Sequence, residues 1–106
     1  MKPPVWLRSA ERSREKQLDY YATLNPLAAI DMDAEIDRVA DLLGENPKMG
    51  RKGRVAGTLE VVMSGAPFVL VYRLNAGAPE ILRVLHQSQQ WPPTKAKARR
   101  VTVAMK

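Results

Sequence analysis

Apolar residues in the second half of the chain gather in three short runs with turn sequences between them. The runs cover residues 57–63, 68–74 and 80–86. The stretches between them, residues 64–67 and 75–79, contain the Gly, Pro, Ser and Asn that are typical of tight turns. Because such turns join antiparallel neighbours, the pattern predicts a three-stranded antiparallel meander. The middle run is apolar on both faces, which predicts a central position.

The first half of the chain has the spacing of amphipathic helices. Ser9 is the expected N-cap of a helix over residues 10–24, and Asn25 followed by Pro26 is a typical start of a second helix. Apolar residues recur at steps of three and four in the second helix and more thinly in the first. The expected buried positions are Ala10, Leu18, Tyr21 and Ala22, then Ala29, Met32, Ile36, Val39 and Leu43. The short link makes the two helices an antiparallel hairpin.

Three further segments complete the predicted fold. Residues 5–7 form a short first strand, Gly44 together with Pro47 ends the second helix, and residues 47–54 form a basic loop. The order predicts an α+β fold, with an N-terminal strand, an antiparallel helix hairpin and a three-stranded antiparallel meander packed on the helices.

The chain is long enough for one compact domain with one core. We expect this domain over residues 1–93, followed by a basic tail over residues 94–106 that contains no acidic residue. Two interpretations of the tail are open: a disordered segment, or a further strand at residues 101–103.

Composition excludes several classes of function. The chain has no cysteine, which rules out disulfides and thiolate chemistry. A single histidine argues against a zinc site, and no motif for a cofactor is present. No apolar run is long enough to cross a membrane, and the first residues do not resemble a signal peptide. We therefore expect a cytoplasmic protein without metal or cofactor.

Charge is distributed unevenly along the chain. The net charge is +6, made of +2 over residues 1–24, −5 over residues 25–47 and +9 over residues 48–106. This separation indicates an acidic or polyanionic partner for the C-terminal half. The alternative is a surface charge that only keeps the protein in solution.

The candidate chemistry lies in polar residues within otherwise apolar strands. Arginine binds phosphate or carboxylate through two parallel hydrogen bonds, and histidine moves protons near neutral pH. Together with the basic loop, such residues can bind or cut nucleic acid. The candidates are Arg51, Lys52, Arg54, Arg73, Arg83 and His86.

Each candidate also has a structural interpretation. His86 can be a strand-end side chain bonded to a carbonyl, and Arg73 and Arg83 can form cross-strand pairs with Glu60 or Glu80. Trp91 can pack against the edge of the domain instead of recognising a ligand. Strict alternation also places Arg83 on the side of Ile81 and opposite His86. We therefore expect Arg83 and His86 to act separately.

At these residues the chain resembles the ParE/RelE superfamily of toxins from type II bacterial toxin–antitoxin systems. The resemblance covers about residues 3–92 in the same order of elements. It is carried by Asn25-Pro26, Pro47-x-x-Gly50-Arg51, Gly57-Thr58-x-Glu60, Val71-Tyr72-Arg73 and Ile81-Leu82-Arg83-Val84-Leu85-His86. It implies a RelE-like fold and hetero-oligomers with an acidic, ParD-like or RelB-like antitoxin. We expect the antitoxin to contact Tyr21, Trp91 and Arg73.

The resemblance leaves two targets open. RelE-like members cut messenger RNA in the ribosome, and a metal-independent endoribonuclease of that kind would use Arg73, Arg83 and His86 here. ParE members poison DNA gyrase without catalysing a reaction. Val69 and Leu59 stand where RNase relatives carry arginine, and residues 84–88 look more like ParE. The sequence therefore favours a gyrase inhibitor, with the mRNA endonuclease as the alternative and an inactive, antitoxin-binding remnant as a third.

Overall fold

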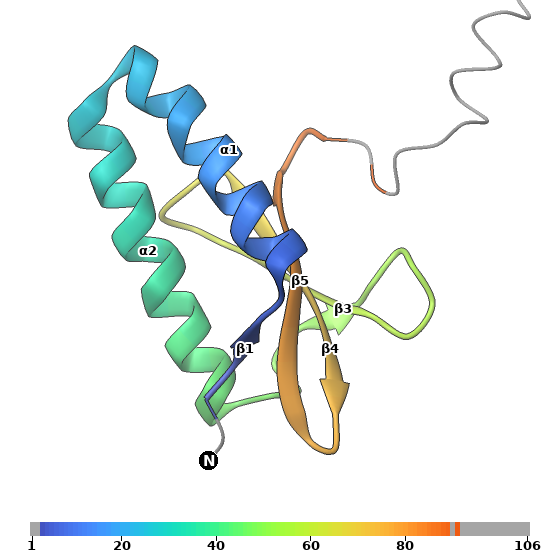
Figure 1. Cartoon of the computed structure of the whole chain (residues 1–106). Coiled ribbons are helices and arrows are strands. Elements are labelled where there is room, and N and C mark those ends of the chain that lie inside the picture. The colour runs from blue at the N-terminus through green and yellow to red at the C-terminus, as the bar shows by residue number, and fades with distance from the viewer. Residues whose placement is uncertain (1–2, 90, 92–106) are drawn as a thin grey trace, which may run out of the picture.

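The computed structural model describes residues 3–89 and 91 of the chain. Two helices form a hairpin that lies beside a sheet (Figure 1). The elements are β1 (Val5–Trp6), α1 (Arg8–Leu24), α2 (Pro26–Glu45), β2 (Arg51–Lys52), β3 (Leu59–Val62), β4 (Phe68–Asn75) and β5 (Ala78–His86). The predicted α+β class, the helix hairpin and the meander are confirmed. The residue 94–106 tail and the suggested strand at residues 101–103 lie outside the described residues.

The sheet is mixed and has the order β1-β5-β4-β3-β2. β1 runs parallel to β5, and the other pairs are antiparallel. β4 is central, as its two apolar faces predict. The prediction of a loop throughout residues 47–54 was wrong, because Arg51 and Lys52 pair with Glu60 and Leu59 as an edge strand. Two strand bounds also differ, since β3 is shorter than predicted and β5 begins at Ala78.

Two predictions about the helix ends were wrong. α1 begins two residues earlier than expected, at Arg8, with Leu7 at the N-cap and no capping side chain. Ser9 instead donates its hydroxyl to the Leu82 carbonyl oxygen, 2.8 Å away. Gly44 lies buried inside α2, which ends one residue later at Glu45. The predicted start of α2 is confirmed, because the Asn25 side chain accepts a hydrogen bond from the Ala28 N–H.

The main core lies between the helix hairpin and one face of the sheet. From α2 it receives Ile36, Val39 and Leu43, and Ala29 is also buried, as the spacing predicts. The sheet contributes alternate residues of β4 with partners from β3 and β5. Its strand residues are Val61, Phe68, Leu70, Tyr72, Ile81 and Val84. The expected burial of Ala22 was wrong, because it is exposed near the end of α1.

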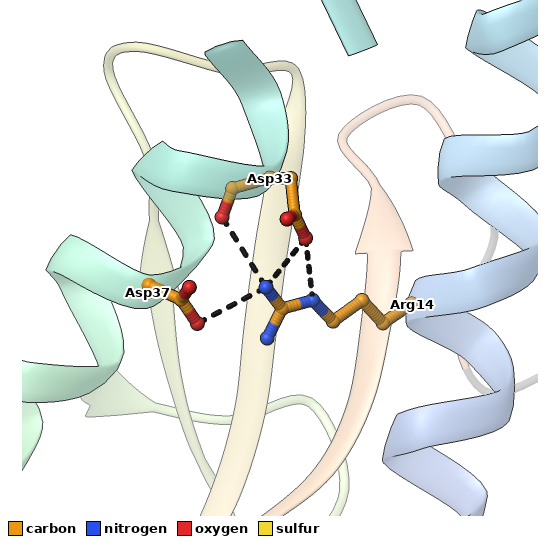
Figure 2. A network of polar contacts seen from close by, with 3 residues as sticks. All are labelled: Arg14, Asp33 and Asp37. Carbon is orange, nitrogen blue, oxygen red and sulfur yellow. Dashed lines mark hydrogen bonds and ion pairs between the residues drawn. The ribbon is translucent and has the colours of Figure 1, made fainter. Parts of the chain in front are cut away.

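A polar contact joins the two helices (Figure 2). The Arg14 guanidinium of α1 donates to the Asp33 carboxylate and carbonyl and, at 3.0 Å, to the Asp37 carboxylate of α2. Its carbon also lies 4.9 Å from the centre of the Trp6 ring. One arginine therefore links both helices and the end of β1.

Candidate functional site

A β-bulge in β5 decides where the candidate residues point. Val71 pairs with Arg83 and Tyr72 pairs with Ile81, so that Leu82 is the extra residue. Ile81 and Val84 consequently both enter the main core. Arg83 lies on the other face, so its predicted placement on the side of Ile81 was wrong. A regular strand was assumed, and a bulge reverses the alternation beyond it.

His86 lies at the end of β5 on the face that the helices cover. Its ring stacks on the ring of Tyr21, and its Nε2 lies 2.9 Å from the Tyr21 hydroxyl. The Ser88 N–H, which can only donate, points at Nδ1 from 3.1 Å. Nδ1 is therefore the acceptor and Nε2 donates to Tyr21 in the neutral ring. His86 is a strand-end side chain, but it bonds a hydroxyl and an N–H instead of the expected carbonyl.

Arg73 lies on the opposite face of the sheet and is neutralised there. Its Nε donates to Glu80 across the β4–β5 ladder at 2.8 Å, as the structural interpretation predicts. The Asn75 amide donates to the same carboxylate. The hydrogen bond from Asn75, and to a lesser extent the one from Arg73, hold the pKa of the Glu80 carboxyl below its ordinary value. Half of the Arg73 side chain is still exposed.

The basic loop is organised around one buried carboxylate. Glu60 is almost fully buried and accepts hydrogen bonds from the Arg54 backbone N–H and Nε at 2.9 and 3.1 Å. Arg51 lies 3.7 Å from the other carboxylate oxygen. Burial raises the pKa of Glu60, but the Arg54 hydrogen bonds and both positive charges outweigh it, so that the pKa is lowered. Lys52 is exposed and forms no ion pair within the described part of the chain.

Two of the motif residues fix the backbone of the same loop. The buried Tyr72 hydroxyl donates to the Pro47 carbonyl at 2.8 Å and accepts from the Gly50 N–H at 2.9 Å. A Cβ on Gly50 would lie 2.7 Å from this hydroxyl, which explains the glycine. Burial raises the pKa of Tyr72 against the opposing Gly50 hydrogen bond. The Pro47-x-x-Gly50 and Val71-Tyr72 motifs are therefore one structural unit.

The face of the sheet away from the helices carries a second, smaller apolar cluster. Val69, Val71 and Leu85 are buried in it, and Leu82 and Trp91 pack against it. Trp91 thus packs against the domain, as its structural interpretation predicts. Val69, at a position where RNase relatives carry arginine, is core.

Leu59, the second such position, packs against the main core on the opposite face. Both positions therefore hold packed apolar side chains, and neither adds a cation to the site.

Two cations of α1 lie beside the candidate Arg83 but were missed from the sequence. Arg12 and Lys16, one helical turn apart, line a hollow of about 330 Å³ with Arg83. Lys16 and Arg83 also line a neighbouring hollow of about 450 Å³ that reaches Tyr20 and Trp91. The sequence pattern that could have identified them is the recurrence of basic residues at positions 8, 12 and 16, which places them on one face of the helix. Only the fold shows that Arg12 and Lys16 lie beside Arg83.

The described residues contain no helix that could span a membrane and no cluster of His, Asp and Glu suited to hold a metal ion. Residues 5–91 match the family model described as the ParE toxin of the type II toxin–antitoxin system parDE. The chain belongs to the ParE toxin family. It is the toxin of a ParDE/RelE-type toxin–antitoxin system, within the superfamily that its motifs resemble.

Three similar proteins agree with the ParE/RelE superfamily. A Sinorhizobium fredii protein named "Putative toxin Y4kP" is 37% identical over 82% of this chain and 90% of its own length. "Toxin RelE2" of Caulobacter vibrioides is 31% identical over 80% of this chain and 94% of its own length. A solved chain of the "Chromosomal ParDE TA system from P. aeruginosa" is 25% identical, with a TM-score of 0.72, and the match covers 81% of this chain and 96% of that chain.

Proposed function

We propose that this ParE-family chain arrests growth as a non-enzymatic inhibitor of DNA gyrase, and that an acidic antitoxin silences it. The carrying observation is that the three groups expected to cut RNA do not converge. His86 lies on the helix side of the sheet, whereas Arg73 and Arg83 lie on the other side. One scissile phosphate cannot reach all three.

The bonding of His86 supports the same proposal. A general base needs a free nitrogen within reach of the proton that it removes. Tyr21 and Ser88 occupy both ring nitrogens of His86. Arg73 is bound to Glu80 and Arg54 to Glu60, so two arginines already have carboxylate partners. This arrangement suits recognition of a protein surface more than stabilisation of charge in a transition state.

The partner part of the proposal is supported by charge and by the solved relative. The described sheet half carries more basic than acidic side chains, so an acidic protein is the complementary partner. The similar structure comes from a ParDE system. We propose that the antitoxin of this chain is encoded beside it, covers the sheet and the hairpin, and forms a hetero-oligomer with it.

The test compares the two targets directly. Purified chain is added to gyrase with supercoiled or relaxed plasmid, and separately to translating ribosomes with primer extension of the mRNA. We expect trapped cleavage or blocked supercoiling, and intact mRNA. A growth assay compares cells that express the folded chain alone with cells that also express the protein encoded beside it. Equal growth of the two cultures would refute toxicity and favour the third interpretation, an inactive remnant that only binds its antitoxin.

The alternative is a ribosome-dependent mRNA endonuclease, and one observation favours it. A relative that is 31% identical carries the name Toxin RelE2. In that case Arg51, Lys52 and Arg54 would hold the RNA backbone, and Arg73, Arg83 or His86 would take part in the reaction. Ribosome-dependent cuts that His86→Ala or Arg73→Ala abolishes would replace the gyrase proposal with this one.

A further inference from the structure

A groove with a cationic wall runs between α1 and the outer edge of β5. Its two hollows share Ser13, Lys16 and Arg83, so they form one continuous depression. Arg12 lines one end, and Tyr20 and Trp91 line the other. The groove therefore combines positive charge with aromatic surface.

The three cations of this groove pair with no carboxylate in the described part of the chain. Among the described residues, no acidic group lies within ion-pair distance of Arg12, Lys16 or Arg83. The Arg83 guanidinium lies 5.8 Å from the centre of the Trp91 ring, and its hydrogen bond to the Leu82 carbonyl is long at 3.5 Å. A bidentate donor held in this way is available to an incoming carboxylate or phosphate.

The backbone beside the groove is already satisfied. The Ser9 hydroxyl binds the Leu82 carbonyl, and the Val84 N–H binds the Ser13 hydroxyl at 2.8 Å. A ligand here cannot pair with β5 at these positions as an added strand. It must be recognised by the side chains of the groove.

We infer that this groove binds an acidic peptide segment whose carboxylates meet Arg12, Lys16 and Arg83 and whose apolar side chains lie on Trp91 and Tyr20. The inference rests on the proposed function, because the antitoxin is the protein that would supply such a segment. It adds Arg12, Lys16 and Arg83 to an interface that the sequence placed at Tyr21, Trp91 and Arg73.

The surroundings favour a peptide over a nucleic acid. Glu11, Glu15 and Asp19 form an exposed acidic stripe on α1 beside the cations, and α2 belongs to the segment with net charge −5. A long phosphate backbone that followed α1 would meet this stripe. A short segment can place a few carboxylates in the groove and avoid the repulsion.

The experiment measures affinity of the full chain for the purified protein encoded beside it, at several salt concentrations. The variants are Arg12→Glu/Lys16→Glu and, separately, Arg83→Gln. Lys48→Glu is the control, because Lys48 is an exposed cation in the turn that follows α2 and does not line the groove. We expect the double variant to weaken Kd about tenfold or more and to flatten its salt dependence, with little change for the control.

Three results would overturn the inference. An unchanged Kd for the folded double variant removes the groove from the interface. Equal weakening by Lys48→Glu indicates a nonspecific charge effect. Tighter binding of a labelled 20-nucleotide oligo-dT that is lost in the double variant assigns the groove to nucleic acid. If the charge reversals do not fold, Arg12→Gln/Lys16→Gln takes their place.

The growth assay of the wild-type chain keeps the two proposals apart. Toxicity that the neighbouring protein relieves, together with an unchanged Kd of the double variant, refutes the groove and leaves the toxin proposal intact. A wild-type chain that is not toxic refutes the proposed function, whatever the variants bind.

Discussion

Single side chains hold the irregular segments of this molecule in place. Tyr72 is the clearest case, because one buried hydroxyl serves both Pro47 and Gly50. Glu60 does the same for the segment that follows, where it binds the backbone and the guanidinium of Arg54. Motif residues that the family resemblance suggested for function thus first determine the shape of the basic loop.

Tyr72→Phe should destabilise the chain by about 1–3 kcal/mol. The substitution keeps the ring but leaves the Pro47 carbonyl and the Gly50 N–H without their partner. The free energy of unfolding in urea measures the loss. Tyr20→Phe is the control and should change little, because the Tyr20 side chain is exposed. Equal losses in the two variants would contradict the assigned role.

Glu60 should make the stability of the fold depend on pH. Its pKa is lower in the folded than in the unfolded chain, so its contribution is complete above the unfolded pKa and is lost as pH falls through the folded pKa. Urea midpoints at pH 7 and at about pH 3 compare wild type with Glu60→Gln. We expect the stability gap between the two proteins to narrow at low pH. A constant gap would show that the charge of Glu60 adds nothing.

At the level of elements, α2 is anchored by one apolar face. Ile36 is fully buried among residues of β4 and β5, whereas Ile30 on the same helix is mostly exposed. Ile36→Ala should therefore cost about 2–5 kcal/mol of unfolding free energy. Ile30→Ala is the matched control and should cost far less. A denaturant titration that gave the same small loss for both would mean that α2 packs differently.

Beyond the end of β1, the first two turns of α1 supply hydrogen-bond partners to the backbone of β5. The hydroxyls of Ser9 and Ser13, one turn apart, serve the free carbonyl of Leu82 and the free N–H of Val84. Ser13→Ala leaves that N–H unsatisfied and should cost about 1–3 kcal/mol. Ser64→Ala, in an exposed turn, is the control. Thermal unfolding of the two variants measures the difference, and no difference would argue against this pairing.

For the whole molecule, charge separation should govern how partners arrive. The helix hairpin contains the acidic segment and the sheet half is basic, so an acidic antitoxin should be steered to the sheet side. Its association rate should fall roughly tenfold or more from low to high salt, with a smaller change in the dissociation rate. Stopped-flow mixing measures both rates. A salt-independent association rate would contradict steering.

Sequence pattern predicted what depends on neighbours in the chain. The spacing of Ile36, Val39 and Leu43 identified the buried face of α2, and the two apolar faces of residues 68–74 identified β4 as central. The bulge at Leu82 was not predicted, because it depends on tertiary packing. It allows both Ile81 and Val84 to point into the core. The meeting of Arg12 with Arg83 was not predicted for the same reason: the fold alone brings α1 beside β5.

The capping errors have a similar cause. Ser9 has a good capping side chain, but it binds the Leu82 carbonyl of the neighbouring strand β5 instead. A structural interpretation of His86 and Arg73 was one of two that the sequence left open, and the structure gives both residues partners within the fold. Their places on opposite faces depend on the register of β4 with β5, and both this register and the identity of the partners required the structure.

Both outer strands of the sheet are only two residues long. This limits aggregation of the chain and the addition of unrelated extended peptides to the edges of the sheet. A long unpaired strand edge is a template on which any extended peptide can polymerise through backbone hydrogen bonds. Here β1 and β2 offer very little of such a template, and the serines of α1 close the next stretch of β5. Discrimination between correct and incorrect partners must therefore be encoded in side chains, which a pair of genes can change together without altering the fold.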